Sequence, residues 1–240
     1  MSTVTDESLR SHRVVSRQQW LDERAAFLKK EKAFSRQREQ LAAERRALPW
    51  MKIDKRYVFD GPKGQQTLAE LFEAQRQLVV YHFMFKPEAE AGCAHCSFWA
   101  DHYSSLPIHL EHRDTGFVVI SRAPLDKIET FRKRMGWTFR WVSSGNTDFN
   151  YDFQASFTPS QMQAGTVFYN YVNGPAMAAD REGISVFYKN DAGEILHTYS
   201  CYARGIDMVN GTYQFLDLTP KGRDEAPGAA QNWVKYHDRY

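Results

Sequence analysis

The chain has 240 residues, of which 42% are hydrophobic and 14% aromatic, enough for one large domain with a packed core. Its 31 basic and 29 acidic side chains leave a net charge of +2, which argues against broad electrostatic binding to nucleic acid or to an anionic membrane. The first seven residues lack a basic cluster and an apolar run, so we expect no secretory signal. The longest apolar run, 78–85, is far shorter than the roughly 20 residues of a membrane-spanning helix. These features predict a cytoplasmic protein with reduced thiols.

A long helix is predicted from Ser16, a suitable N-cap, to about Leu48, just before Pro49. Apolar residues recur every seven positions along it and form a narrow stripe among charges: Trp20, Phe27, Phe34, Leu41 and Leu48. The stripe predicts an amphipathic arm, residues 1–50, that packs on the rest of the protein or on a second copy in a homodimer. Acidic residues interleaved with the basic ones argue against a nucleic-acid arm.

The remaining elements follow in chain order. Strands are predicted at 51–59, 78–85, 115–121, 138–143, 166–172, 184–188 and 195–199. Turns are predicted at 61–64 and 190–193, an irregular segment at 145–164, and a loop at 173–182. Helices are predicted at 68–75, capped by Thr67 and Glu70, at 97–112 with a kink at Pro107, at 124–135, and at 205–215.

The order of these elements predicts an α/β protein with a thioredoxin-like fold. A strand, a helix that begins near two cysteines, a second strand and a second helix are followed by an antiparallel hairpin and a last helix. Such an order produces a mixed central sheet flanked by helices, with a parallel part from the crossovers and an antiparallel part from the hairpin. We therefore expect a thioredoxin-like domain at 51–218 and a C-terminal tail, 219–240, packed on it.

The candidate functional centre is the dithiol Cys93-Ala94-His95-Cys96 at the start of a helix. Cys93 would face unpaired backbone N–H groups, which favour the thiolate and lower its pKa from the ordinary value of roughly 8.5. Cys96, one turn deeper, would stay protonated, so Cys93 is the expected nucleophile and Cys96 the resolving thiol. His95 can supply a positive charge or a donor near the sulfur.

Other interpretations of the same residues remain open. The two cysteines could be small packed side chains without chemistry. They could also bind zinc with His102, His109 and His112, although Pro107 interrupts that helix and no second cysteine pair exists, so we expect neither a metal nor a cofactor. The third cysteine, Cys201, has no partner at a motif spacing and is expected to be a packed thiol.

The chain resembles a bacterial thioredoxin-like family of unknown function whose members are labelled predicted dithiol–disulfide oxidoreductases. The resemblance runs from about residue 16 to the C-terminus and rests on these segments: 46–50, 81–87, 92–102, 141–144, 148–150, 184–187, 197–199, 203–205, 216–220 and 237–238. It implies the thioredoxin-like fold and activity on a disulfide or thiol substrate, either a protein or a small molecule.

The chain is also similar, more distantly, to the peroxiredoxins, because Phe85-Lys86-Pro87 is followed by a short loop to Cys93. Peroxiredoxins place Thr or Ser three residues before the cysteine, where this chain has Glu90, whose carboxylate would repel an anionic sulfur. Thioredoxins place a proline before the strand that faces the dithiol, where this chain has Arg181-Glu182-Gly183, and Arg181 could bring a positive charge to the sulfur.

Three functional hypotheses result. The first is a thiol–disulfide oxidoreductase that uses Cys93, His95 and Cys96. The second is a thiol peroxidase that uses the same residues. The third is a non-enzymatic binding or scaffold protein that keeps the fold, since function belongs to sites rather than to folds.

Overall fold

A computed structural model describes residues 9–240 of the chain. The first seven residues, for which we expect no secretory signal, lie outside this range. The chain forms two compact units. One unit contains the chain up to Pro49 together with Phe215–Ala230, and the other contains Trp50–Gln214 together with Gln231–Tyr240. The expected division into 1–50, 51–218 and 219–240 stays a prediction.

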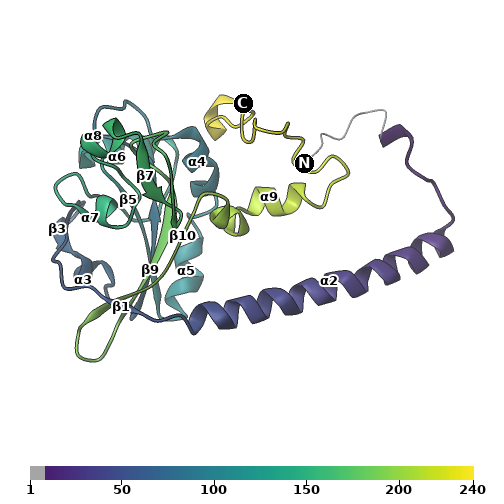
Figure 1. The fold of residues 1–240 in the computed structure, drawn as a ribbon, viewed down its shortest axis with the longest axis horizontal. Coiled ribbons are helices and arrows are strands. Elements are labelled where there is room, and N and C mark those ends of the chain that lie inside the picture. The colour runs from purple at the N-terminus through teal and green to yellow at the C-terminus, as the bar shows by residue number, and fades with distance from the viewer. Residues whose placement is uncertain (1–8) are drawn as a thin grey trace. The chain divides into compact units, whose positions relative to one another are not determined.

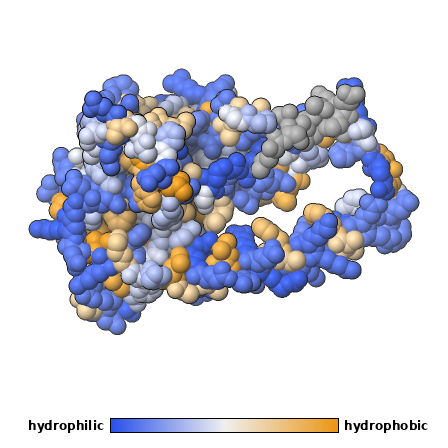
Figure 2. Space-filling model, in the orientation of Figure 1, coloured by the Kyte–Doolittle hydropathy of each residue, from blue (hydrophilic) through white to orange (hydrophobic). Residues whose placement is uncertain are grey.

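The long predicted helix is present as α2, Arg17–Arg46. Ser16 and Gln19 form a capping box at its start, and its C-cap is Ala47. None of its residues is buried, and Trp20 and Phe27 are more than half exposed. Figure 2 shows the apolar side chains of α2 as separate groups on a hydrophilic surface. Their packing on the domain or on a second copy stays a prediction. No helix among residues 9–240 is long and apolar enough to cross a membrane.

The larger unit is built on an eight-stranded mixed sheet. Its strands are β1 (Met51–Lys52), β2 (Val58–Gly61), β3 (Gly64–Thr67), β4 (Gln77–His82), β5 (Thr115–Ser121), β6 (Trp141–Ser143), β9 (Gly183–Lys189) and β10 (Ile195–Tyr202). They lie in the order β1-β10-β9-β4-β5-β6-β2-β3. A separate two-stranded hairpin consists of β7 (Thr166–Tyr169) and β8 (Val172–Pro175).

The central strands confirm the thioredoxin-like fold. β4 and β5 are parallel, β9 pairs antiparallel with β4, and β10 pairs antiparallel with β9. The helices are α3 (Leu68–Leu71), α4 (Ala94–Ala100), α5 (Leu106–Glu111), α6 (Leu125–Arg134), α7 (Phe149–Asp152), α8 (Pro159–Gln163) and α9 (Gly211–Leu216), with 3-10 turns η1 (Ala203–Val209) and η2 (His237–Arg239). Figure 1 shows α3 and α7 on one side of the sheet and α4 and α5 on the other.

Alternation along β4 divides its side chains between the two faces of the sheet. Leu78, Val80 and His82 point to the face that packs against α3 and α7, where Phe149 and other aromatic rings fill the core. Tyr81 points to the opposite face, beneath the cysteine-bearing helix α4. The same strand therefore carries polar groups into both layers of the core.

The predicted strand 51–59 is wrong, because its two ends belong to opposite sides of the sheet. β1 pairs with β10, whereas β2 pairs with β3 and β6. Val58 lies only six positions after Lys52, and an extended chain covers at most about 3.6 Å per position, or about 22 Å. Six strand positions in a flat sheet span about 29 Å at about 4.8 Å each. The sheet must therefore curl so that this short connection, 53–57, can join β1 to β2.

Three further predictions need correction. The helix 97–112 is interrupted, because α4 ends at Ala100 and Pro107 lies in the first turn of α5, where its missing N–H is tolerated. The irregular segment 145–164 contains α7 and α8, the latter started by a Thr158–Gln161 capping box. The strand at 166–172 is in fact the β7–β8 hairpin, which continues to Pro175, and the predicted loop begins only after it.

Candidate functional site

The dithiol lies where the sequence predicts it, between β4 and the first turn of α4. Cys93 is the N-cap of α4, its main-chain N–H donates to Met84 O at 3.0 Å, and its carbonyl accepts from Ser97 N at 3.0 Å. The residue before it, Gly92, has no space for a side chain. A Cβ there would lie 2.6 Å from Phe83 Cε1 and 2.9 Å from Phe131 Cε1. The glycine thus lets the backbone approach the aromatic core and fixes where α4 begins.

The two thiols have different surroundings. Cys93 is half-buried, whereas Cys96 is 1% exposed and its Sγ accepts from Met84 N at 3.4 Å. Of these two residues, therefore, only Cys93 is partly exposed to a dissolved reactant.

The surroundings also separate the acidities of the two thiols. A hydrogen bond from the Cys96 side chain, together with the main-chain N–H groups of Cys96 and His95, lowers the pKa of Cys93 to about 7 against the opposing effect of burial. Burial and the neighbouring Cys93 sulfur raise the pKa of Cys96 well above its usual range. A thiolate at Cys93 beside a protonated Cys96 is the arrangement that these effects favour.

The acidic group that acts on both sulfurs is Glu182, a residue that sequence reasoning did not select. Its negative charge raises the pKa of Cys93 and of Cys96. Arg181, expected near the sulfur, instead places its guanidinium over the ring of Tyr169 at 4.6 Å. The carboxylate of Glu90, expected to repel Cys93, is 92% exposed and contacts Lys127 at 3.3 Å.

Two tyrosines lie beneath the dithiol. Burial raises the pKa of Tyr81 and of Tyr103 well above the ordinary value, and the Cys96 thiol adds to this shift in both. Their rings meet edge to face at 5.1 Å. Cys201 lies on the same side, because it pairs with Ile184, which pairs in turn with Tyr81. Cys201 also acts on Tyr103, so the third cysteine faces this layer rather than the opposite one.

The other candidate side chains are not brought to the sulfurs. The His95 imidazole is exposed and forms no hydrogen bond or ion pair with another residue of the range 9–240. Its main-chain N–H, however, faces the Cys93 sulfur. His102 Nε2 bonds Thr212 Oγ1 at 3.0 Å. Within the described part of the chain, no three His, Cys, Asp or Glu side chains group as metal ligands.

The C-terminal residues of the larger unit border the dithiol. The Tyr236 hydroxyl donates to Gly92 O at 2.6 Å, and the Cys93 sulfur contributes to a raised pKa at this tyrosine. Asp238 holds the segment in place through two hydrogen bonds of 2.9 Å from Arg134. The segment leaves Cys93 partly exposed rather than covered.

A second polar cluster lies on the other face of the sheet. The fully buried His82 shares a hydrogen bond of 2.9 Å between Nε2 and Ser185 Oγ, which is 2.8 Å from Ser200 Oγ. Ser200 Oγ in turn lies 2.7 Å from His197 Nε2. The ring of His82 stacks on Phe149 at 5.6 Å. Burial lowers the pKa of His82 to about 4, so the imidazole is neutral at pH 7.

Comparison with known proteins identifies the family. The model of the family "Bacterial protein of unknown function (DUF899)" matches residues 9–240. The chain belongs to this family. The resemblance recognised in the sequence motifs is thereby confirmed. No protein with a curated description matches the chain.

Several solved structures with some similarity are peroxiredoxins. Peroxidoxin BcpB from Mycobacterium tuberculosis is 14% identical with a TM-score of 0.46, covering 68% of this chain and 94% of that one. A mutant of peroxiredoxin Q from Xanthomonas campestris is 13% identical with a TM-score of 0.44, covering 67% and 89%. Similarity this low gives no information about the chemistry of the DUF899 chain.

Proposed function

We propose that the protein is a cytoplasmic thiol–disulfide oxidoreductase that reacts through Cys93 and Cys96. The observation that carries the proposal is the asymmetry of the pair. Cys93 is partly exposed, and its pKa is lowered to about 7. Cys96 is buried, has a raised pKa and donates a hydrogen bond to the Cys93 sulfur. A nucleophilic thiolate needs access and a pKa near the ambient pH, whereas a resolving thiol needs only to reach the first sulfur.

The reaction proceeds as two exchanges. The Cys93 thiolate attacks one sulfur of a substrate disulfide, forms a mixed disulfide and releases the other substrate sulfur as a thiolate. Cys96 then loses its proton and attacks the Cys93 sulfur, which releases the second substrate sulfur as a thiol. The substrate gains two electrons, and the protein is left with a Cys93–Cys96 disulfide, which an external dithiol returns to the reduced form.

Other groups have defined parts in this proposal. The main-chain N–H groups of His95 and Cys96 stabilise the Cys93 thiolate, and the His95 imidazole, which is exposed, can form a hydrogen bond with an incoming substrate. The substrate disulfide belongs to a protein or a small molecule. The residues immediately before Ile184 are Arg181-Glu182-Gly183 and include no proline, so a peptide substrate would meet Glu182 there.

The test is a single-turnover reaction of the reduced protein with oxidised glutathione. We expect Cys93→Ser to abolish thiol release and Cys96→Ser to stop at a stable mixed disulfide detected by mass spectrometry. Cys201→Ser is the matched control and keeps full activity. Full activity of both the Cys93 and Cys96 variants would refute the proposal.

A reaction with hydroperoxide distinguishes the thiol–disulfide oxidoreductase from the thiol peroxidase. Oxidation of Cys93 by hydroperoxide, followed by stopped flow, should be no faster than that of free cysteine if disulfide exchange is the function. A much faster reaction would instead favour the peroxidase, whereas inertness toward both disulfide and peroxide would favour a scaffold protein.

A further inference from the structure

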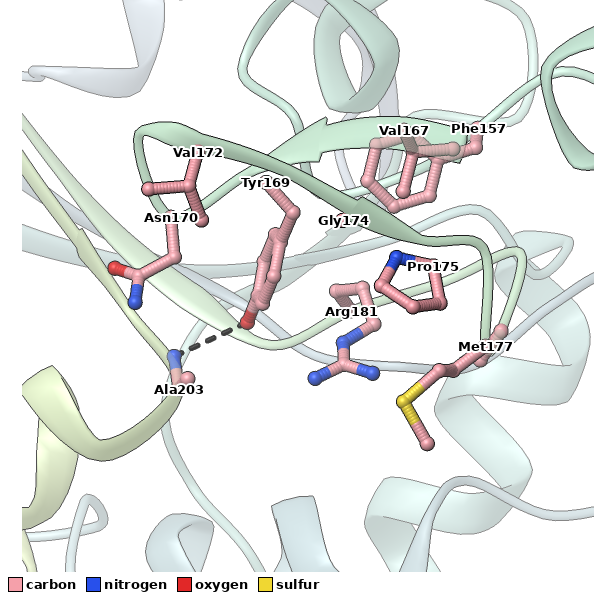
Figure 3. A pocket seen from close by; sticks show the side chains of 11 residues that line it. Phe157, Val167, Tyr169, Asn170, Val172, Gly174, Pro175, Met177, Arg181 and Ala203 are labelled. Atoms are coloured by element: carbon pink, nitrogen blue, oxygen red, sulfur yellow. Dashed lines mark hydrogen bonds between the residues drawn. The ribbon is translucent and has the colours of Figure 1, made fainter. Parts of the chain in front are cut away.

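A cavity of about 240 Å³ lies beneath the β7–β8 hairpin and contains none of the three cysteines in its lining. Phe157, Val167 and Tyr169 form apolar walls, and Figure 3 shows them with Arg181 in the same view. Val172 and Met177, at its rim, are 62% and 80% exposed. Large apolar side chains left in solvent around a hollow are typical of a ligand site rather than of a closed core.

The polar groups of this cavity differ in whether they are already bonded. The Tyr169 hydroxyl donates to Glu182 O at 2.8 Å and accepts from Ala203 N at 3.0 Å, so it is occupied (Figure 3). Arg181 is different. Its guanidinium hydrogen-bonds with the Tyr169 hydroxyl, but it forms no ion pair with any residue of 9–240, and its buried Nε has no hydrogen-bond partner there.

The Glu182 carboxylate lies 3.5 Å from the Tyr169 hydroxyl but forms no ion pair with Arg181. A half-buried guanidinium without a directly paired anion is energetically unfavourable, and a bound carboxylate would relieve this. The guanidinium plane matches a carboxylate, to which it can donate two parallel hydrogen bonds. The cation is held in place by the Tyr169 ring, 4.6 Å away, so little side-chain entropy is lost on binding.

The volume limits the size of the ligand. At about 30 Å³ for each water-sized group, the cavity holds about eight such groups. The walls are mostly carbon, so the body of the ligand must be apolar. We propose that this cavity binds a small organic carboxylate with an apolar body, which pairs with Arg181 and fills the space between Phe157 and Val167.

This site does not depend on the dithiol chemistry. The cavity nevertheless lies near the dithiol, since the Tyr169 hydroxyl donates a hydrogen bond to Glu182 O, and the negative charge of Glu182 acts on both sulfurs. Retention of binding in Cys93→Ser separates the two proposals: the cavity binds its ligand whether or not the cysteines react.

The test is calorimetric titration of the full chain with benzoate, which has about nine non-hydrogen atoms and suits the size of the cavity. Benzyl alcohol, with the same ring and no charge, is the matched ligand. We expect saturable binding of benzoate, at least about tenfold tighter than that of benzyl alcohol, because a charge-assisted bond is lost in the alcohol. Equal affinities, or no saturable binding of benzoate, would overturn the proposal.

Variants locate the binding. Arg181→Met keeps an apolar stem and should remove the preference for benzoate, whereas Arg204→Met, at an exposed arginine nearby, should preserve it. Gly174 is paired with the buried Val167 and has open space around its Cβ position, so Gly174→Leu should fill the cavity and abolish binding. Asn173→Leu, on the opposite face of the same strand, is the control and should bind normally. Normal benzoate binding by folded Gly174→Leu would place the ligand elsewhere and refute the proposal.

Discussion

Lowering the pH should destabilise the protein through His82, which is fully buried and whose pKa is lowered to about 4 from an ordinary value of 6.5. The unfolded chain takes up a proton at this histidine below about pH 6.5, whereas the folded chain does so only near pH 4. Between these values the unfolded state binds more protons, so the free energy of unfolding falls as the pH falls. The full shift corresponds to about 3.5 kcal/mol at about 1.4 kcal/mol per unit, and about 2 kcal/mol of this is lost by pH 5.

Urea unfolding followed by tryptophan fluorescence at about pH 7 and about pH 5 measures this loss. The test variant is His82→Gln, whose amide can still form a hydrogen bond with Ser185 but does not titrate, and the control is the exposed His112→Gln. We expect the loss of stability between the two pH values to be about 2 kcal/mol smaller in His82→Gln than in the wild type and in the control. An equal loss in all three proteins would show that His82 is protonated in the folded state and that the reasoning is wrong.

Two further predictions concern the dithiol itself. Cys96→Ala should raise the pKa of Cys93, measured by thiolate absorbance, because the hydrogen bond from Cys96 is the largest cause of its lowering. Glu182→Gln should lower the pKa of Cys93, because it removes a negative charge near the thiolate. An unchanged Cys93 pKa in both variants would contradict the electrostatic account. Gly92→Ala should destabilise the protein by about 1–3 kcal/mol in urea unfolding, because the new methyl group meets the buried Phe83 ring. A neutral effect of Gly92→Ala would mean that the loop before Cys93 can shift freely.

Local patterns in the sequence were sufficient to predict much of the fold. Ser16 marks the start of α2, Thr67 and Glu70 form the predicted capping box, and the apolar run 115–121 is β5 over the same residues. These features depend only on neighbours in the chain. The strand predicted at 51–59 failed because strand pairing is not local: the alternation is the same whichever strand becomes the partner.

The candidate site shows the same division. The placement of Cys93 at a helix start follows from two cysteines after a buried strand, and it could be predicted. Glu182 and Tyr236 could not, because each approaches the sulfur only through the tertiary fold. A signal for His82 was present, since a histidine inside an apolar run needs a buried partner, but Ser185 is about 100 residues away.

The pairing of β1 with the distant β10 affects the order in which the sheet can form during synthesis. β2 can find β3 as soon as both leave the ribosome, but β1 must wait for β10, which emerges nearly 150 residues later. Until β10 has formed, β1 has no partner strand and cannot take its place at the edge of the sheet. A truncated product that stops before residue 195 would expose the backbone of β9 as an open edge, and such edges recruit other chains.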